Sequence, residues 1–225
     1  MKTALKLSFL FALAMFVFAC GGSTENKVEA EEASEEVAAP AAAAAVYNVD
    51  TTASIVNWTG GKVLDILDKH NGTVKISEGS LAVEDGKLTA GNFTIDMTSI
   101  VNEDVPEDKG KAKLEGHLKS PDFFSVEEYP TATFEITSVE AVEGSADMTH
   151  NITGNLTMHG ETKQITIPAN VAMEDGKVTA VTPEFTIDRT EWNVMYASDK
   201  IEGLAKDKVI SNDLTLKIML NASAS

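Results

Sequence analysis

The chain has 225 residues and a formal net charge of −17, because 35 Asp and Glu residues outnumber 18 Lys and Arg residues. No stretch is basic enough to bind a phosphate backbone, so we expect no nucleic-acid partner, and the same charge repels anionic lipid headgroups. The single cysteine excludes a disulfide within the chain.

Residues 1–19 have the composition of a signal peptide. Lys2 and Lys6 give a basic start, and "LSFLFALAMFVFA" is an apolar run too short to cross a bilayer. The run ends at Cys20, and "VFAC" resembles a bacterial lipobox, in which the cysteine carries the lipid. We therefore expect lipid attachment at Cys20, with ordinary cleavage and a free thiol as the alternative. The residue after Cys20 is Gly21, whereas an aspartate at this position holds lipoproteins of enteric bacteria at the inner membrane. We therefore expect a lipoprotein of the outer membrane in a bacterial cell envelope, on either the periplasmic or the surface face of that membrane.

Residues 20–45 follow as an acidic, alanine-rich segment. They hold six glutamates, one lysine and no aromatic residue. Such a composition buries too little apolar surface to offset the entropy of ordering, so we expect a disordered tether. The folded domain then covers residues 46–225.

Alternation of apolar and polar residues dominates that domain and predicts β-strands. The runs are, in chain order, "SIVNWTG" (54–60), "GTVKISEGSLAVEDGKLTAGNFTIDM" (72–97), "TATFEITSVEAV" (131–142), "HNITGNLTMHG" (150–160), "KQITIPANVAMEDGKVTAVTPEFTIDR" (163–189) and "DLTLKIMLNA" (213–222). The pairs Asp85-Gly86 and Asp175-Gly176 mark tight hairpins, because both central residues take positive φ. Helix signals are few and predict one or two short helices, one within residues 105–120 that ends near Ser120 and one at residues 62–69.

About eight antiparallel strands in one domain are compatible with a β-sandwich or a closed barrel. A barrel of this size has an interior that its own side chains fill or that holds one small ligand. Alternation alone leaves both possibilities open.

Three segments carry a family resemblance. "HLKSPDFFSVEEYPTATFEI" (117–136), "GNLTMHGETKQITIPA" (154–169) and "FTIDRTEWNV" (185–194) resemble the YceI-like family, over a stretch from Tyr47 to Ala222. Members of that family are exported, lipocalin-shaped proteins that hold a polyisoprenoid chain inside a β-barrel. The resemblance implies an all-β, antiparallel, up-and-down lipocalin-like barrel of about eight strands with one or two short helices.

The same resemblance implies a binding protein and not an enzyme. Its ligand would be an isoprenoid lipid, either a polyprenyl compound or an isoprenoid quinone, and no other cofactor is expected. The protein would act as a carrier or a store attached to the membrane by its lipid. The alternative is an envelope interaction or structural module with a filled barrel core. Oligomeric state stays open.

We expect the ligand to contact inward-facing apolar side chains of the strands and of the aromatic turn that precedes residue 131. These residues are Trp58, Phe93, Phe123, Phe124, Phe134, Ile136, Leu156, Met158, Phe185, Ile187, Trp192 and Met195. Phe123 and Phe124 are adjacent on a tight turn and are expected to make different contacts, one of them at the end of the barrel. Whether they face the ligand or only seal the core is left open.

Polar motifs in the sequence do not indicate catalysis. No H-E-x-x-H, His-Cys or G-x-S-x-G spacing occurs. His117 and His159 lie in the two strongest motifs and are expected to be hydrogen-bonded turn residues, not metal ligands. Asp188 and Arg189 are expected to form a salt bridge at the end of a strand, with a buried pair or a clamp on the ligand's head group as alternatives.

Overall fold

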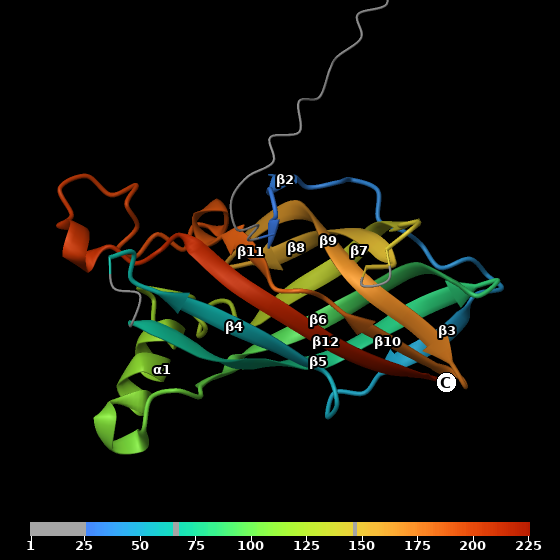
Figure 1. The fold of residues 1–225 in the computed structure, drawn as a ribbon, viewed down its shortest axis with the longest axis horizontal. Helices are drawn as coiled ribbons and strands as arrows, with labels where there is room; N and C mark the ends of the chain where they lie inside the picture. The colour runs from blue at the N-terminus through green and yellow to red at the C-terminus, as the bar shows by residue number, and fades with distance from the viewer. Residues whose placement is uncertain (1–25, 65–67, 146–147) are drawn as a thin grey trace, which may run out of the picture.

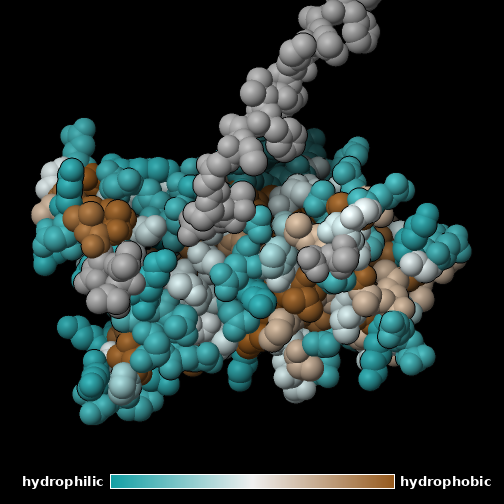
Figure 2. All heavy atoms as spheres, viewed as in Figure 1, coloured by the Kyte–Doolittle hydropathy of each residue, from teal (hydrophilic) through white to brown (hydrophobic). Residues whose placement is uncertain are grey.

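A computed structural model describes residues 26–64, 68–145 and 148–225. The predicted signal peptide and Cys20 lie outside the described residues. Within the described ranges, no helix is long and apolar enough to cross a membrane. Figure 2 shows hydrophilic side chains over much of one face of the molecule, with hydrophobic side chains in smaller groups between them.

The described chain forms one 12-stranded, predominantly antiparallel sheet that closes into a barrel (Figure 1). Closure occurs at β4, which pairs with β5 on one side and with β12 on the other. The strands are β1 (Asn26–Lys27), β2 (Glu31–Glu32), β3 (Ala45–Val49), β4 (Ile55–Gly61), β5 (Lys69–Glu84), β6 (Lys87–Asn102), β7 (Thr131–Ala141), β8 (His150–Met158), β9 (Glu161–Glu174), β10 (Lys177–Val181), β11 (Phe185–Asp188) and β12 (Asp213–Ala224).

The wall of the barrel has eight positions, as the sequence predicts. β3 and β4 share one position, because both lie between β5 and β12. β10 and β11 share another, because both pair with β12 at successive levels. The remaining six positions belong to β5, β6, β7, β8, β9 and β12. The predicted up-and-down barrel is confirmed.

Two hairpins have the predicted turn geometry. Asp85 and Gly86 have φ of 50° and 73°, and Asp175 and Gly176 have φ of 50° and 72°. Positive φ at both central residues matches the right-handed twist of the strands that the turn joins. The second turn fixes the register of β9 with β10, which is continuous. The pairing of β5 with β6 instead has register shifts between Thr73 and Lys75, between Ile76 and Glu78 and between Ala82 and Val83.

In the described part of the chain, one α-helix, α1 (Lys111–Lys119), connects β6 to β7 and confirms the short helix predicted to end near Ser120. Short 3₁₀ turns occur at η1 (Glu107–Lys109), η2 (Arg189–Trp192) and η3 (Lys206–Lys208). The helix predicted at residues 62–69 does not form in the described part of that stretch, because Lys62 makes a bridge to Ile210 and Lys69 begins β5. Residues 65–67 lie outside the described residues. In Figure 1, α1 and the η2–β12 loop lie at one end of the barrel, and the C-terminus lies at the other.

Residues 26–45 differ from the disordered tether that the composition predicts. β1 pairs in parallel with β11, and β2 pairs antiparallel with β9. Val28 is buried, and Ser34 exchanges two hydrogen bonds with the side chain of Asn155, at 2.9 and 2.8 Å. The physical reason is that β9 and β11 do not pair with each other, so their backbone groups need other partners. Composition alone does not reveal such free strand edges.

Gly154 on β8 provides a test of the barrel's internal packing. A Cβ built there would stand 2.7 Å from the carbonyl oxygen of Glu135 and closer still to the ring of Phe134. The carbonyl oxygen belongs to the backbone and cannot move aside, so we expect Gly154→Ala to destabilise the protein by about 1–3 kcal/mol, as overpacking does. Urea unfolding followed by circular dichroism measures the change.

Gly116 is the matched control, because it lies inside α1 and a Cβ built there meets nothing within 4 Å. Gly116→Ala should stabilise the protein by about 0.5–1 kcal/mol, since alanine favours a helix. Equal effects of the two substitutions would contradict this account of the packing.

Candidate functional site

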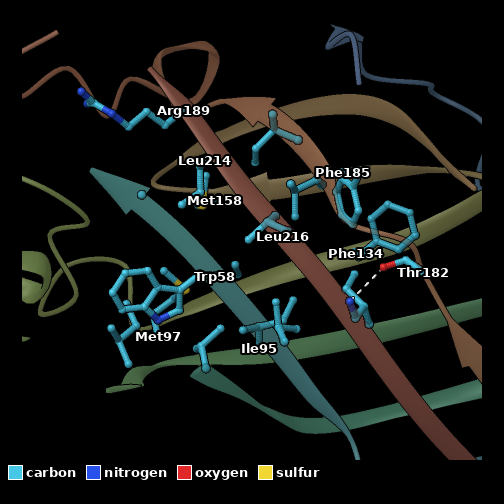
Figure 3. A pocket seen from close by; sticks show the side chains of 18 of the residues that line it. Trp58, Ile95, Met97, Phe134, Met158, Thr182, Phe185, Arg189, Leu214 and Leu216 are labelled. Atoms are coloured by element: carbon cyan, nitrogen blue, oxygen red, sulfur yellow. Dashed lines mark hydrogen bonds between the residues drawn. The ribbon is translucent and has the colours of Figure 1, made fainter. Parts of the chain in front are cut away.

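A cavity of about 440 Å³ lies inside the barrel. Such a volume falls within the range of about 300–1,000 Å³ that is usual for small-molecule sites. Its walls are almost entirely apolar and come from β4 to β12 and α1, as the close view in Figure 3 illustrates for part of the lining.

The cavity exists because inward side chains on several strands do not meet across the barrel. Six of them face inward and line the cavity but keep some exposed surface, namely Phe93, Ile95, Phe134, Leu214, Leu216 and Ile218. In a closed barrel, an inward side chain that stays partly exposed is exposed to the internal space. Phe93 and Phe134 stack with their ring centroids 6.5 Å apart and cover one part of the wall. The interior is therefore hollow over much of its length.

Side chains fill the end of the barrel that is remote from α1. Leu88, Ala90, Val178 and Ala222 are at most 4% exposed there, next to the β5–β6 and β9–β10 hairpins. Because these small and medium side chains close this end, a long ligand would enter from the α1 end.

The structure brings together ten of the twelve residues predicted to contact a ligand. All ten line the cavity, and they are Trp58, Phe93, Phe123, Phe124, Phe134, Ile136, Leu156, Met158, Phe185 and Ile187. Trp192 and Met195 are not among the lining residues. Trp192 is 0% exposed, and its Nε1 donates to the backbone oxygen of Leu156 at 2.9 Å, so its ring belongs to the packing of the wall.

Sequence reasoning omitted two groups of lining residues from the expected site. The first group is apolar and comes mainly from β4, β5 and β12. Alternation in the sequence is the signal that could have identified its members, which are Val56, Val74, Ile76, Leu214, Leu216 and Ile218. The second is polar and gathers at the α1 end: Lys62, Asp68, His70, His117, Arg189 and Asp213. No spacing in the sequence indicates the second group, because its members come from separate loops and strand ends.

Phe123 and Phe124 form an aromatic cluster between α1 and the cavity. Their rings meet edge to face at 5.0 Å, and both side chains are buried and line the cavity. The two rings thus share one contact, and Phe123 makes further ring contacts with His117 and Tyr196. The turn that carries them is closed by the N–H groups of Phe123 and Ser125, which donate to Ser120 O, and Ser125 has φ of 47°. This turn folds the two rings back onto each other.

Arg189, the one arginine of the sequence, is 2% exposed and ties the loop after η2 to the barrel. Its guanidinium donates to Ser211 O at 3.0 Å, Tyr196 O at 2.9 Å, Ile210 O at 3.2 Å and also Val194 O. Burial lowers the pKa of Arg189. Its charge is therefore held by backbone carbonyl dipoles.

The expected salt bridge between Asp188 and Arg189 does not form. Asp188 caps η2 by accepting from the Thr190 N–H at 2.9 Å, and it pairs with Lys200 Nζ at 3.3 Å. Arg189 instead stacks over the ring of Phe123, with 5.1 Å from Cζ to the ring centroid. The adjacent residues of the Asp-Arg pair thus point to different partners.

A network of ionisable groups surrounds the start of β5. Lys62 Nζ lies 2.6 Å from Asp68, and the two ring nitrogens of His70 lie 3.4 Å from Asp68 and 2.9 Å from Asp104. The hydrogen bond from Lys62 lowers the pKa of Asp68. Burial raises the pKa of Asp104, but bonds from the Asn71 N–H and from His70 outweigh it, so this pKa is also lowered. Both carboxylates are therefore ionised at neutral pH.

His117 and His159 have separate structural partners. His117 packs edge to face on Tyr196 at 4.7 Å, and the ring Nδ1 of His159 lies 3.1 Å from Trp192 O. Among the residues that the structure describes, no group of three or more His, Cys, Asp and Glu side chains is arranged to hold a metal ion.

The fold and the cavity define a class of protein: closed antiparallel β-barrels that enclose one apolar internal site. The family follows from the sequence comparison, in which the model of the YceI-like domain matches residues 47–222. The chain therefore belongs to the YceI-like family, as its motifs indicate.

Curated relatives include the UPF0312 protein PA0423 of Pseudomonas aeruginosa, which is 42% identical over 89 residues, covering 39% of this chain and 44% of the relative. A UPF0312 protein of Pseudomonas putida is 35% identical over 101 residues, covering 44% of this chain and 47% of the relative. The chain thus spans about half the length of the curated relatives it matches.

Two solved structures share the fold. BcnA of Burkholderia cenocepacia is 23% identical with a TM-score of 0.60, covering 78% of this chain and 99% of that chain. A polyisoprenoid-binding domain from Saccharophagus degradans, implicated in plant cell wall breakdown, is 20% identical with a TM-score of 0.56. That match covers 80% of this chain and 98% of the domain.

Proposed function

We propose that this protein binds one long isoprenoid chain, of a polyprenyl compound or an isoprenoid quinone, inside its barrel and serves as a membrane-anchored carrier or store. The observation that carries the proposal is the apolar cavity of about 440 Å³ in a YceI-like domain. The solved structure of the polyisoprenoid-binding domain from Saccharophagus degradans, which has the same fold, supports an isoprenoid as the ligand.

The energetics of such binding are favourable. Each methylene group that the cavity removes from water contributes about 0.8 kcal/mol. A few isoprene units therefore exceed the cost of association, which is about 4–15 kcal/mol. Binding needs no covalent step, and it should depend little on salt because the contact is apolar.

The alternative is an interaction module whose barrel is filled by its own side chains. A filled interior would leave inward residues such as Ile95 and Leu216 without exposed surface, whereas both retain some. The hollow interior therefore favours the binding function over the interaction module.

The decisive experiment is to express the full chain in bacteria with a lipid-rich envelope, purify it and extract it with organic solvent. Mass spectrometry of the extract should find about one polyprenyl or isoprenoid quinone molecule per barrel. An extract free of isoprenoid species would oppose the proposal and favour the interaction module.

Anchoring at Cys20 is a separate part of the proposal. Cys20→Ser removes the thiol that would carry the lipid, so the variant should move from the outer-membrane fraction to the soluble exported fraction. Fractionation followed by immunoblotting measures the shift, and Ser23→Ala serves as a control that keeps the cysteine. Unchanged membrane association of Cys20→Ser would rule out lipidation at this position.

A further inference from the structure

Trp58 carries a buried hydrogen-bond donor that has no partner among the described residues. Its Nε1 is buried, and no acceptor among the described residues forms a hydrogen bond with it. The indole lines the cavity and lies against Gly72, where a Cβ would stand 2.8 Å from the ring. Figure 3 shows the Trp58 side chain among the lining residues, on the same side of the view as Arg189 and away from Phe134 and Phe185.

The second tryptophan, Trp192, provides a comparison, because its indole N–H is paired within the wall of the barrel. Trp192 is fully buried, and its Nε1 donates to Leu156 O at 2.9 Å. Buried polar groups in native proteins are nearly always paired, because an unpaired one loses its bonds to water without replacement. The unpaired N–H of Trp58 therefore indicates an acceptor that the ligand supplies.

The position of Trp58 places that acceptor near the polar end of the cavity. Trp58 pairs with Gly72 on β5 and Leu216 on β12, and Gly60, two residues further along β4, pairs with His70. Two residues of a strand correspond to roughly 6–7 Å. The donor thus lies between the ionisable network at the start of β5 and the apolar interior, where the head of a lipid would meet its chain.

The charges at this end disfavour an anionic head. Of the described lining residues, Lys62 is paired with Asp68 and Arg189 is held by four backbone carbonyls. Two carboxylates, those of Asp68 and Asp213, also line the cavity. A phosphate group would have to displace existing partners of these cations and would approach two like charges, whereas a neutral oxygen acceptor needs only the N–H.

We propose that Trp58 Nε1 donates a hydrogen bond to a neutral oxygen of the ligand's head group, and that this residue makes the barrel select an isoprenoid quinone over a polyprenyl phosphate. This inference rests on the proposed function, because it assumes an isoprenoid chain in the cavity. It adds a residue that distinguishes head groups within that ligand class.

The test uses three probes that share one chain: a farnesyl-substituted benzoquinone, farnesyl monophosphate and the hydrocarbon farnesene. Each is titrated by calorimetry into the purified full chain, after co-purified lipid has been removed with detergent. Wild type should bind the quinone tightest and the phosphate no better than the hydrocarbon. Trp58→Phe should weaken quinone binding by roughly three- to tenfold, the worth of one hydrogen bond, and leave farnesene binding unchanged.

Nuclear magnetic resonance gives a second readout that a purely structural role would not change. The sequence has two tryptophans, so the indole N–H region holds two signals. The quinone should move the Trp58 signal strongly downfield and leave that of Trp192 in place, with Trp58→Phe providing the assignment.

Two outcomes would overturn the inference alone: equal weakening of quinone and farnesene by Trp58→Phe, or tightest binding of the phosphate by wild type. Failure of all three probes to bind wild type would overturn the proposed function and this inference with it.

Discussion

Tryptophan at position 216 is expected to exclude lipid from the barrel and leave the fold intact. Leu216 lies on β12 between Trp58 of β4 and Phe185 of β11, and its side chain faces the cavity. The larger ring would extend into open space, so it should cost less than the 1–3 kcal/mol or so that is typical of overpacking a filled core. Ile136 is a poorer position, because it is only 1% exposed.

Lys217 offers a matched control on the same strand. Its side chain is exposed and points outward, so Lys217→Trp adds the same bulk outside the barrel. Mass spectrometry of organic extracts should find isoprenoid in wild type and in Lys217→Trp, and little or none in Leu216→Trp. Strong destabilisation of Leu216→Trp together with an empty wild-type extract would indicate a filled core.

Replacing Arg189 by methionine is expected to cause the largest loss of stability. Methionine has a similar length but no donor, so the backbone oxygens of Ser211, Val194, Tyr196 and Ile210 would lose the donor that they share. Leaving a buried acceptor without its donor typically costs about 1–3 kcal/mol, and four acceptors are affected here. Arg189→Lys should recover part of this loss, because an ammonium group donates from a single point and cannot reach all four oxygens.

Urea denaturation followed by circular dichroism measures these changes. Lys200→Met is the control, because Lys200 also forms ion pairs near η2, but its side chain is 45% exposed. An exposed pair of this kind is worth at most about 1 kcal/mol. A loss in Arg189→Met no larger than that in Lys200→Met would show that the four carbonyl contacts do not stabilise the loop.

Sequence patterns determined the strands, the hairpins and the closed barrel. Alternation is a local property, because successive side chains of a strand point to opposite faces, so the inward residues could be read directly from the chain. Asp85-Gly86 and Asp175-Gly176 specify their turns through positive φ, which needs no tertiary contact. Motifs around Phe123 and Phe124 supplied the family, and with it the choice of a barrel over a sandwich.

Only the tertiary structure decided whether the barrel is hollow, because the space between facing side chains depends on the diameter and stagger of the whole wall. The tertiary structure also decided how the hydrogen bonding of the two tryptophans differs. Trp192 donates to Leu156 O, which is distant in the sequence, whereas Trp58 faces the cavity. Residues 26–45 have the composition of a solvated tether, yet β1 and β2 within them pair with the edges of β11 and β9, which exist only after the barrel forms. Contacts between residues that are distant in the sequence produce no periodic pattern from which they could be predicted.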